Sequence, residues 1–149
     1  MARIRVSTMI DAPPAQVWEE VRHIDRHVHW MADAERITFR GPKTAGVGTA
    51  FDCETKVGPF RLTDRMEITE WQDAKVMGVR HEGMVTGTGR FKLSRARGGR
   101  TRFSWDERLV FPLWMGGPVG AAVGGRVLRR IWKRNLRALK AIIEADTTG

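Results

Sequence analysis

The chain has 149 residues, of which 42% are hydrophobic and 29% charged, a composition typical of a single folded domain of ordinary size. Its one cysteine, Cys53, excludes an internal disulfide and a zinc site built on several thiolates. No apolar run reaches the length of a transmembrane helix, and the first residues lack the apolar core of a signal peptide, so we expect a cytoplasmic protein.

The excess positive charge lies in one segment near the C-terminus. The net charge is +9, and residues 126–140 contain no acid but seven cations: Arg126, Arg129, Arg130, Lys133, Arg134, Arg137 and Lys140. This segment can be a solvated outer face, a contact with an anionic membrane surface, or a nucleic-acid site. We favour the solvated face, then the membrane. Nucleic acid is disfavoured because no recognised nucleic-acid motif accompanies the charge.

The first part of the chain predicts one strand followed by two short helices. Residues Arg3–Ile10 alternate between the two faces expected of a strand with one buried side. Two prolines then precede apolar residues at helical spacing, which predicts a helix over Pro13–Arg22. We expect a second short helix or turn over His27–Met31.

The middle of the chain predicts six more strands, separated by turns that contain glycine. A strand begins at Glu35, and the others are expected over residues 49–57, 60–71, 75–82, 85–95 and 101–111. Gly58-Pro59 and Gly98-Gly99 mark two of the turns. Together with the first strand, these segments predict a curved antiparallel sheet of about seven strands.

The sequence changes character after Pro112. Leu113–Gly125 is apolar and rich in glycine, and it fits either the rim of a pocket or simple core packing. From there to about Ala145, apolar residues recur with helical period opposite the basic face, which predicts one long helix. We expect one α+β domain over residues 1–149. In it the helix lies across the apolar face of the sheet and leaves an apolar cavity between them.

The order of these elements and several short segments resemble the START/Bet v 1-like (SRPBCC) superfamily, nearest its bacterial polyketide cyclase/dehydrase and lipid-transport members. The segments that carry the resemblance are Ile10–Trp18, His29-Trp30, Gly46–Thr49 and Thr101–Glu107. The resemblance implies a helix-grip fold with a hydrophobic pocket for lipids, sterols, polyketides or similar molecules. It supplies no universal catalytic residue, and fold alone does not determine a reaction.

One titratable residue falls in the apolar register of each of three predicted strands: Asp64, His81 and Glu107. These groups are candidates for acid–base catalysis, for anchoring the polar end of a ligand, or for structural pairing with arginine. Apolar walls are expected from the same strands, the rim and the long helix. The candidate ligand-binding residues are Phe60, Leu62, Met66, Met77, His81, Phe103, Trp105, Glu107, Trp114, Leu128 and Ile131.

We therefore expect a protein that binds a hydrophobic small molecule such as a lipid or polyketide. The alternative is a cyclase or dehydratase that uses Glu107, Asp64 or His81 as acid and base. No cofactor or metal is predicted, because the histidines of residues 23–29 are irregularly spaced. Cys53 lacks an adjacent base and is not expected to be a nucleophile. The sequence does not specify an oligomeric state.

Overall fold

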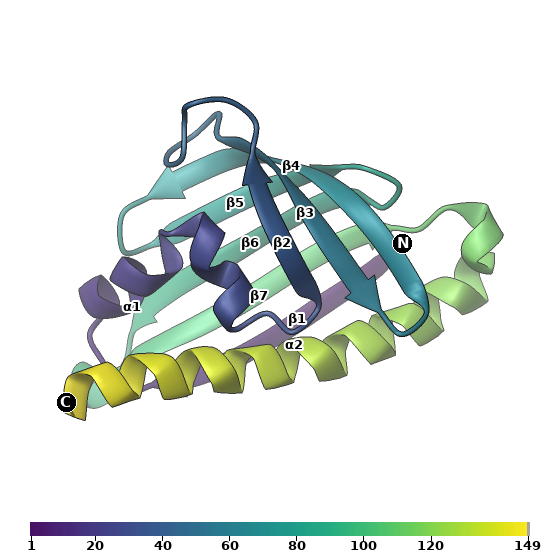
Figure 1. Cartoon of the computed structure of the whole chain (residues 1–149). Coiled ribbons are helices and arrows are strands. Elements are labelled where there is room, and N and C mark those ends of the chain that lie inside the picture. Colours follow the sequence, from purple (N-terminus) through teal and green to yellow (C-terminus); the bar gives the residue numbers. More distant parts are fainter. Residues whose placement is uncertain (149) are drawn as a thin grey trace.

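The computed structural model describes residues 1–148, which form a seven-stranded sheet, one long helix and several short helices (Figure 1). In chain order the elements are β1 (Ala2–Ile10), α1 (Pro14–Val21), the 3-10 helix η1 (Ile24–His29), β2 (Ala34–Phe39), β3 (Ala50–Val57), β4 (Phe60–Gln72), β5 (Val76–Glu82), β6 (Thr86–Arg95), η2 (Arg97–Gly99), β7 (Thr101–Val110), η3 (Leu113–Met115) and α2 (Gly117–Thr148).

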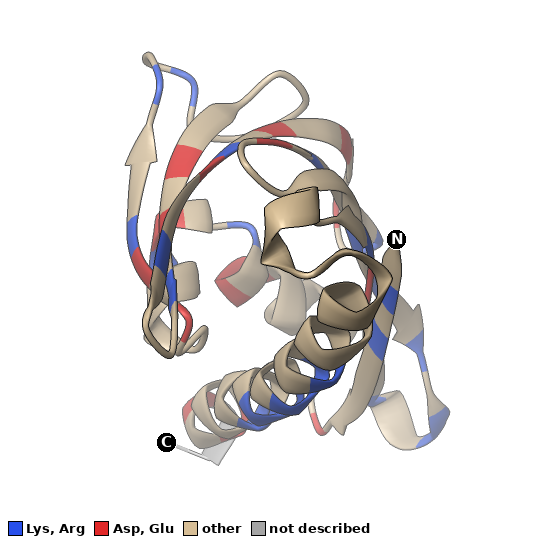
Figure 2. Cartoon of the chain, turned by 90° about the vertical axis from the view of Figure 1, so that its right-hand side faces the viewer, with Lys and Arg blue, Asp and Glu red and all other residues tan. Residues whose placement is uncertain are grey.

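Every neighbouring pair of strands is antiparallel, in the order β1-β7-β6-β5-β4-β3-β2. The last strand therefore pairs with the first, and all other neighbours are consecutive in the sequence. A register shift between Ile68 and Glu70 interrupts the β4–β5 ladder, and such irregularities bend a strand. The sheet curves around α2, as the view along the helix shows (Figure 2). This is the helix-grip arrangement expected from the sequence.

The long helix is held by the apolar stripe that the sequence predicted. Trp132, Leu136, Leu139 and Ile143 are at most 5% exposed, and their spacing places them on one helical face. Most of the cations between them point outward (Figure 2). The helix begins at Gly117, directly after a turn with positive φ at Gly116, so it includes the later part of the glycine-rich stretch.

Aromatic side chains fill the space under the sheet at the end where α1 and η1 lie. Trp30 from the loop after η1 has its ring within 6.4 Å of the rings of Phe91, Phe103 and Trp105. Val17, which α1 contributes to this core, is fully buried. At the opposite end, where α2 carries glycine and valine, a cavity remains between the helix and the sheet.

The predicted elements are all found, and the strand ends differ from their expected positions by one residue at most. The helices differ more: the second short helix begins at Ile24 and not at His27, and the long helix begins at Gly117 and not near Gly125. No helix among the described residues is long and apolar enough to cross a membrane.

Candidate functional site

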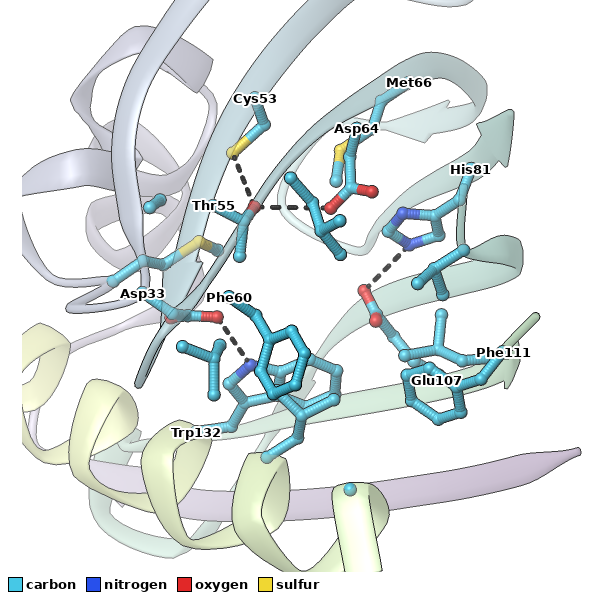
Figure 3. A pocket seen from close by; sticks show the side chains of 18 of the residues that line it. Asp33, Cys53, Thr55, Phe60, Asp64, Met66, His81, Glu107, Phe111 and Trp132 are labelled. Carbon is cyan, nitrogen blue, oxygen red and sulfur yellow. Dashed lines mark hydrogen bonds and ion pairs between the residues drawn. The ribbon is translucent and has the colours of Figure 1, made fainter. Parts of the chain in front are cut away.

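A cavity of about 780 Å³ lies between the concave face of the sheet and the first half of α2. This volume is within the usual range for small-molecule sites. Strands β2 to β7 contribute to its walls, and most of the side chains that line it are apolar (Figure 3). The cavity lies at the end of the molecule that the aromatic core leaves unfilled.

The structure brings most of the sequence-predicted residues to this cavity. Its lining includes Asp64 and the following ligand-binding candidates: Phe60, Leu62, Met66, Met77, His81, Trp105, Glu107, Trp114 and Leu128. Phe103 and Ile131 lie outside the lining. Phe103 is fully buried in the aromatic core, with its ring 5.2 Å from that of Phe91. Ile131 packs against the core beside it.

His81 and Glu107 form a buried pair in the cavity wall. Nε2 of His81 lies 3.3 Å from Oε1 of Glu107, and the side chains are 6% and 7% exposed. Burial alone would lower the pKa of His81. The charge and hydrogen bond of Glu107, with a smaller contribution from Asp64, outweigh burial and raise that pKa above its usual value. The imidazole therefore keeps its proton to higher pH than a free histidine.

Glycine in the intervening strand allows this pair to form. His81 is on β5 and Glu107 on β7, and β6 runs between them with Gly87 opposite His81 and Gly89 opposite Glu107. A Cβ at residue 89 would lie 2.5 Å from Oε1 of Glu107. Gly89 thus leaves room for the Glu107 side chain to cross β6. Sequence reasoning missed this role, although glycine at alternate positions of a strand was a visible signal.

Asp64 faces the same space from β4 (Figure 3). The hydroxyl of Thr55 lies 3.3 Å from Oδ2 of Asp64, whereas Oδ1 is buried and has no hydrogen-bond partner among the described residues. Burial raises the pKa of this carboxyl, against the opposing effects of His81 and Thr55. An unpartnered buried oxygen is a natural contact for a polar ligand group.

The wall nearest α2 is braced by a network that the sequence did not reveal. Asp33, just before β2, accepts hydrogen bonds from Nε1 of Trp132 at 3.1 Å and from Nδ2 of Asn135 at 2.8 Å. Trp132 also stacks on Trp105, with ring centroids 4.4 Å apart and planes 11° from parallel. These contacts fix α2 against the sheet and hold two indole rings beside the cavity.

Two other titratable residues in the lining are uncharged. Burial lowers the pKa of His27 to about 4, and its Nε2 lies 2.7 Å from the carbonyl oxygen of Val21. Burial also raises the pKa of Cys53 to about 12, so this side chain is a thiol at neutral pH. Within residues 1–148, no three side chains of His, Cys, Asp or Glu gather as metal ligands would.

The glycine-rich segment forms the rim of the cavity. Trp114 and Val123 line the cavity and are at least 58% exposed, and neighbouring Leu113 and Val119 are more exposed still. Gly120 lets the chain fold back closely here, since a Cβ on it would lie 1.9 Å from the carbonyl oxygen of Met115. Of the two alternatives for this segment, the structure supports the rim.

The fold and the cavity define a helix-grip protein. The chain belongs to the polyketide cyclase/dehydrase and lipid transport family, whose model matches residues 1–144. No curated protein matches the chain in sequence.

Solved structures with this fold cover almost the whole chain. The protein TTHA0849 from Thermus thermophilus is 16% identical with a TM-score of 0.80, over 97% of this chain and 98% of that one. The Zhui aromatase/cyclase from a Streptomyces species is also 16% identical with a TM-score of 0.76, over 95% of this chain and 93% of that one. XoxI from Bacillus cereus is 13% identical with a TM-score of 0.73, over 96% of each chain. At these identities the similarity establishes the fold and leaves function to the site.

Proposed function

We propose that the protein binds a hydrophobic small molecule, such as a lipid or polyketide, in the cavity between α2 and the sheet. The observation that carries the proposal is a cavity of about 780 Å³ with apolar walls and a buried polar cluster on one side. Apolar walls favour transfer of a hydrophobic body out of water, and the cluster orients the polar end. Phe60, Leu62 and Leu128 supply part of the apolar surface.

A pair of tryptophan substitutions on β4 tests the proposal. Leu62 lines the cavity, whereas Thr63 is exposed on the other face of the same strand. Leu62→Trp adds a bulky side chain to the cavity wall and narrows the space for a ligand. The uncharged dye Nile red should therefore bind the native protein and Thr63→Trp, but bind Leu62→Trp at least about tenfold more weakly. Equal binding to all three proteins places the dye elsewhere and contradicts the proposal.

A second candidate, a cyclase or dehydratase, is favoured by the chemistry of the polar cluster. Asp64 holds its proton to higher pH than usual and faces the His81–Glu107 pair. In loss of water from a β-hydroxy ketone, a base of this cluster removes the α-proton and an acid protonates the departing hydroxyl. The products are an enone and water, so no other reactant is needed.

The enzymatic candidate is tested by incubating the protein with aromatic β-hydroxy ketones and following enone absorbance. An enzyme that uses the pair should form enone, and Glu107→Gln should remove most of the rate while leaving Nile red binding in place. No enone above the uncatalysed rate with any of these ketones leaves hydrophobic ligand binding as the function.

We also propose that the basic face of α2 contacts anionic membrane surfaces. Six of its seven cations are exposed, and Lys140 pairs with Glu144. Of the exposed apolar rim residues, Val119 lies in the first turn of the same helix, and Leu113 lies in η3, just before it. Apolar side chains followed by cations fit an interface between lipid tails and anionic headgroups.

A further inference from the structure

We infer that the ligand presents a hydrogen-bond donor without negative charge, such as an alcohol, phenol or amine, to Asp64, and that the cavity rejects carboxylates and phosphates. The inference rests on the proposed binding function and specifies the class of ligand. It follows from three features of the cavity: a free acceptor, an excess of carboxyl groups, and the lack of an available cation.

The free acceptor is Oδ1 of Asp64. Asp64 is 9% exposed, and Oδ1 has no partner among the described residues, while Oδ2 is next to the Thr55 hydroxyl. The carboxyl group points into the cavity beside His81 (Figure 3). A buried carboxyl oxygen without a partner is costly, so a ligand group that donates to it recovers a hydrogen bond that the empty protein lacks.

Carboxyl groups outnumber the cationic groups that face the interior of the cavity. Asp33, Asp64 and Glu107 line the cavity with the imidazole of His81. With Asp33 and Glu107 as carboxylates, these four groups carry a net negative charge even when His81 is protonated and Asp64 is neutral. An anionic ligand would be placed in a poorly hydrated space against like charge, whereas a neutral or cationic donor would not.

No basic side chain in the lining is available to offset that charge. Arg90 is the only Lys or Arg among the described lining residues, and its Nε and Nη2 donate to Oε1 of Glu70 at 3.1 and 2.6 Å. His27 also lines the cavity, but its pKa of about 4 makes it neutral. The cations of residues 126–140 lie outside the lining, and most of them are on the outer side of α2 (Figure 2).

Three molecules with the same twelve-carbon chain separate the ligand classes: dodecan-1-ol, dodecylamine and dodecanoate. Each is used at pH 7, below the concentration at which it forms micelles or a separate phase, to displace Nile red from the full chain. We expect the alcohol and the amine to bind about tenfold or more tightly than dodecanoate, the ratio that a buried donor–acceptor contact commonly provides.

Asp64→Asn tests whether Asp64 sets this preference. The Thr55 hydroxyl can donate to the amide oxygen, which leaves the NH₂ group facing the cavity as a donor. The preference for dodecan-1-ol over dodecanoate should then fall by about fivefold or more. Asp52→Asn is the matched control, because Asp52 pairs with Arg40 on the outer side of β3 and should leave the preference unchanged.

The outcomes distinguish this inference from the proposed function. If dodecanoate displaces the dye from the native protein as well as the alcohol does, the inference is overturned and cavity binding stands. An unchanged preference in Asp64→Asn, with the variant folded by circular dichroism, overturns the assignment to Asp64. If neither the dye nor any of the three molecules binds, the proposed function fails and the inference fails with it.

Discussion

Removal of the Glu107 charge should lower the stability of the folded protein most at pH values at which His81 is protonated. Glu107→Gln keeps the size of the side chain but removes the carboxylate that raises the pKa of His81. A histidine whose pKa is higher in the folded chain than in the unfolded chain makes its full contribution to stability at pH values below the pKa of the unfolded chain. That contribution is lost as the pH rises through the pKa of the folded chain. The effect of the substitution should therefore be larger at pH 5.5 than at pH 9.

The size of the effect follows from the geometry of the pair. The side chains are 6% and 7% exposed, with 3.3 Å between Nε2 and Oε1, so solvent screens them little. Hydrogen bonds to charged groups contribute about 1.5–3 kcal/mol. For a chain of this length each kcal/mol changes the Tm by roughly 2–4 °C. We expect the Tm to fall by about 3–12 °C at pH 5.5, and by a smaller amount at pH 9.

Thermal unfolding of both proteins at the two pH values measures this difference directly. Comparison of the variant with the native chain cancels the titration of groups that the substitution does not touch. Glu82→Gln is the control, because Glu82 pairs with Arg80 on the exposed surface and should change the Tm little at either pH. An equal loss of Tm at pH 5.5 and pH 9, or none at either, would refute the coupling between Glu107 and His81.

Three further predictions concern the strand glycine, the cysteine and the basic helix. Gly89→Ala should displace the Glu107 carboxylate and lower the pKa of His81, measured by NMR titration; an unchanged titration curve would show that β6 does not need glycine there. Because the pKa of Cys53 is about 12, its reaction with a thiol reagent at pH 8 should be about a thousandfold slower in the folded than in the unfolded chain, and comparable rates would contradict its burial. The chain should sediment with anionic but not neutral vesicles, with binding that weakens as salt is added and after Arg130→Glu; salt-insensitive binding would exclude the basic face as the contact.

Period-two patterning predicted the strands because alternate side chains of a half-buried strand enter different environments. The same alternation placed Asp64, His81 and Glu107 on the face that lines the cavity. Alternation along a strand specifies which face of the sheet a side chain occupies, but it does not specify how deep in the core that position lies. Phe103 and Trp105 share a face, yet Phe103 lies deeper in the aromatic core and only Trp105 reaches the cavity.

Contacts between distant segments were beyond prediction from a single sequence. The register of β5, β6 and β7 determines that Gly89 lies beside Glu107, and that register depends on the complete sheet. The hydrogen bonds of Asp33 with Trp132 and Asn135 likewise join segments far apart in the chain. The rim depends on how the chain turns at Gly116, where φ is +103°.

The methionines offer the most direct test of the claim that a hydrophobic molecule binds in this cavity. Met31, Met66, Met77 and Met115 line the cavity, whereas Met1, Met9 and Met84 lie outside it. The measurement is an NMR titration of methyl-labelled methionine with dodecan-1-ol. We expect the signals of the four lining methyl groups to shift together and saturate, while those of Met1, Met9 and Met84 stay in place. Shifts confined to these three outer methionines, or no shift at the solubility limit of the alcohol, would contradict binding in the cavity.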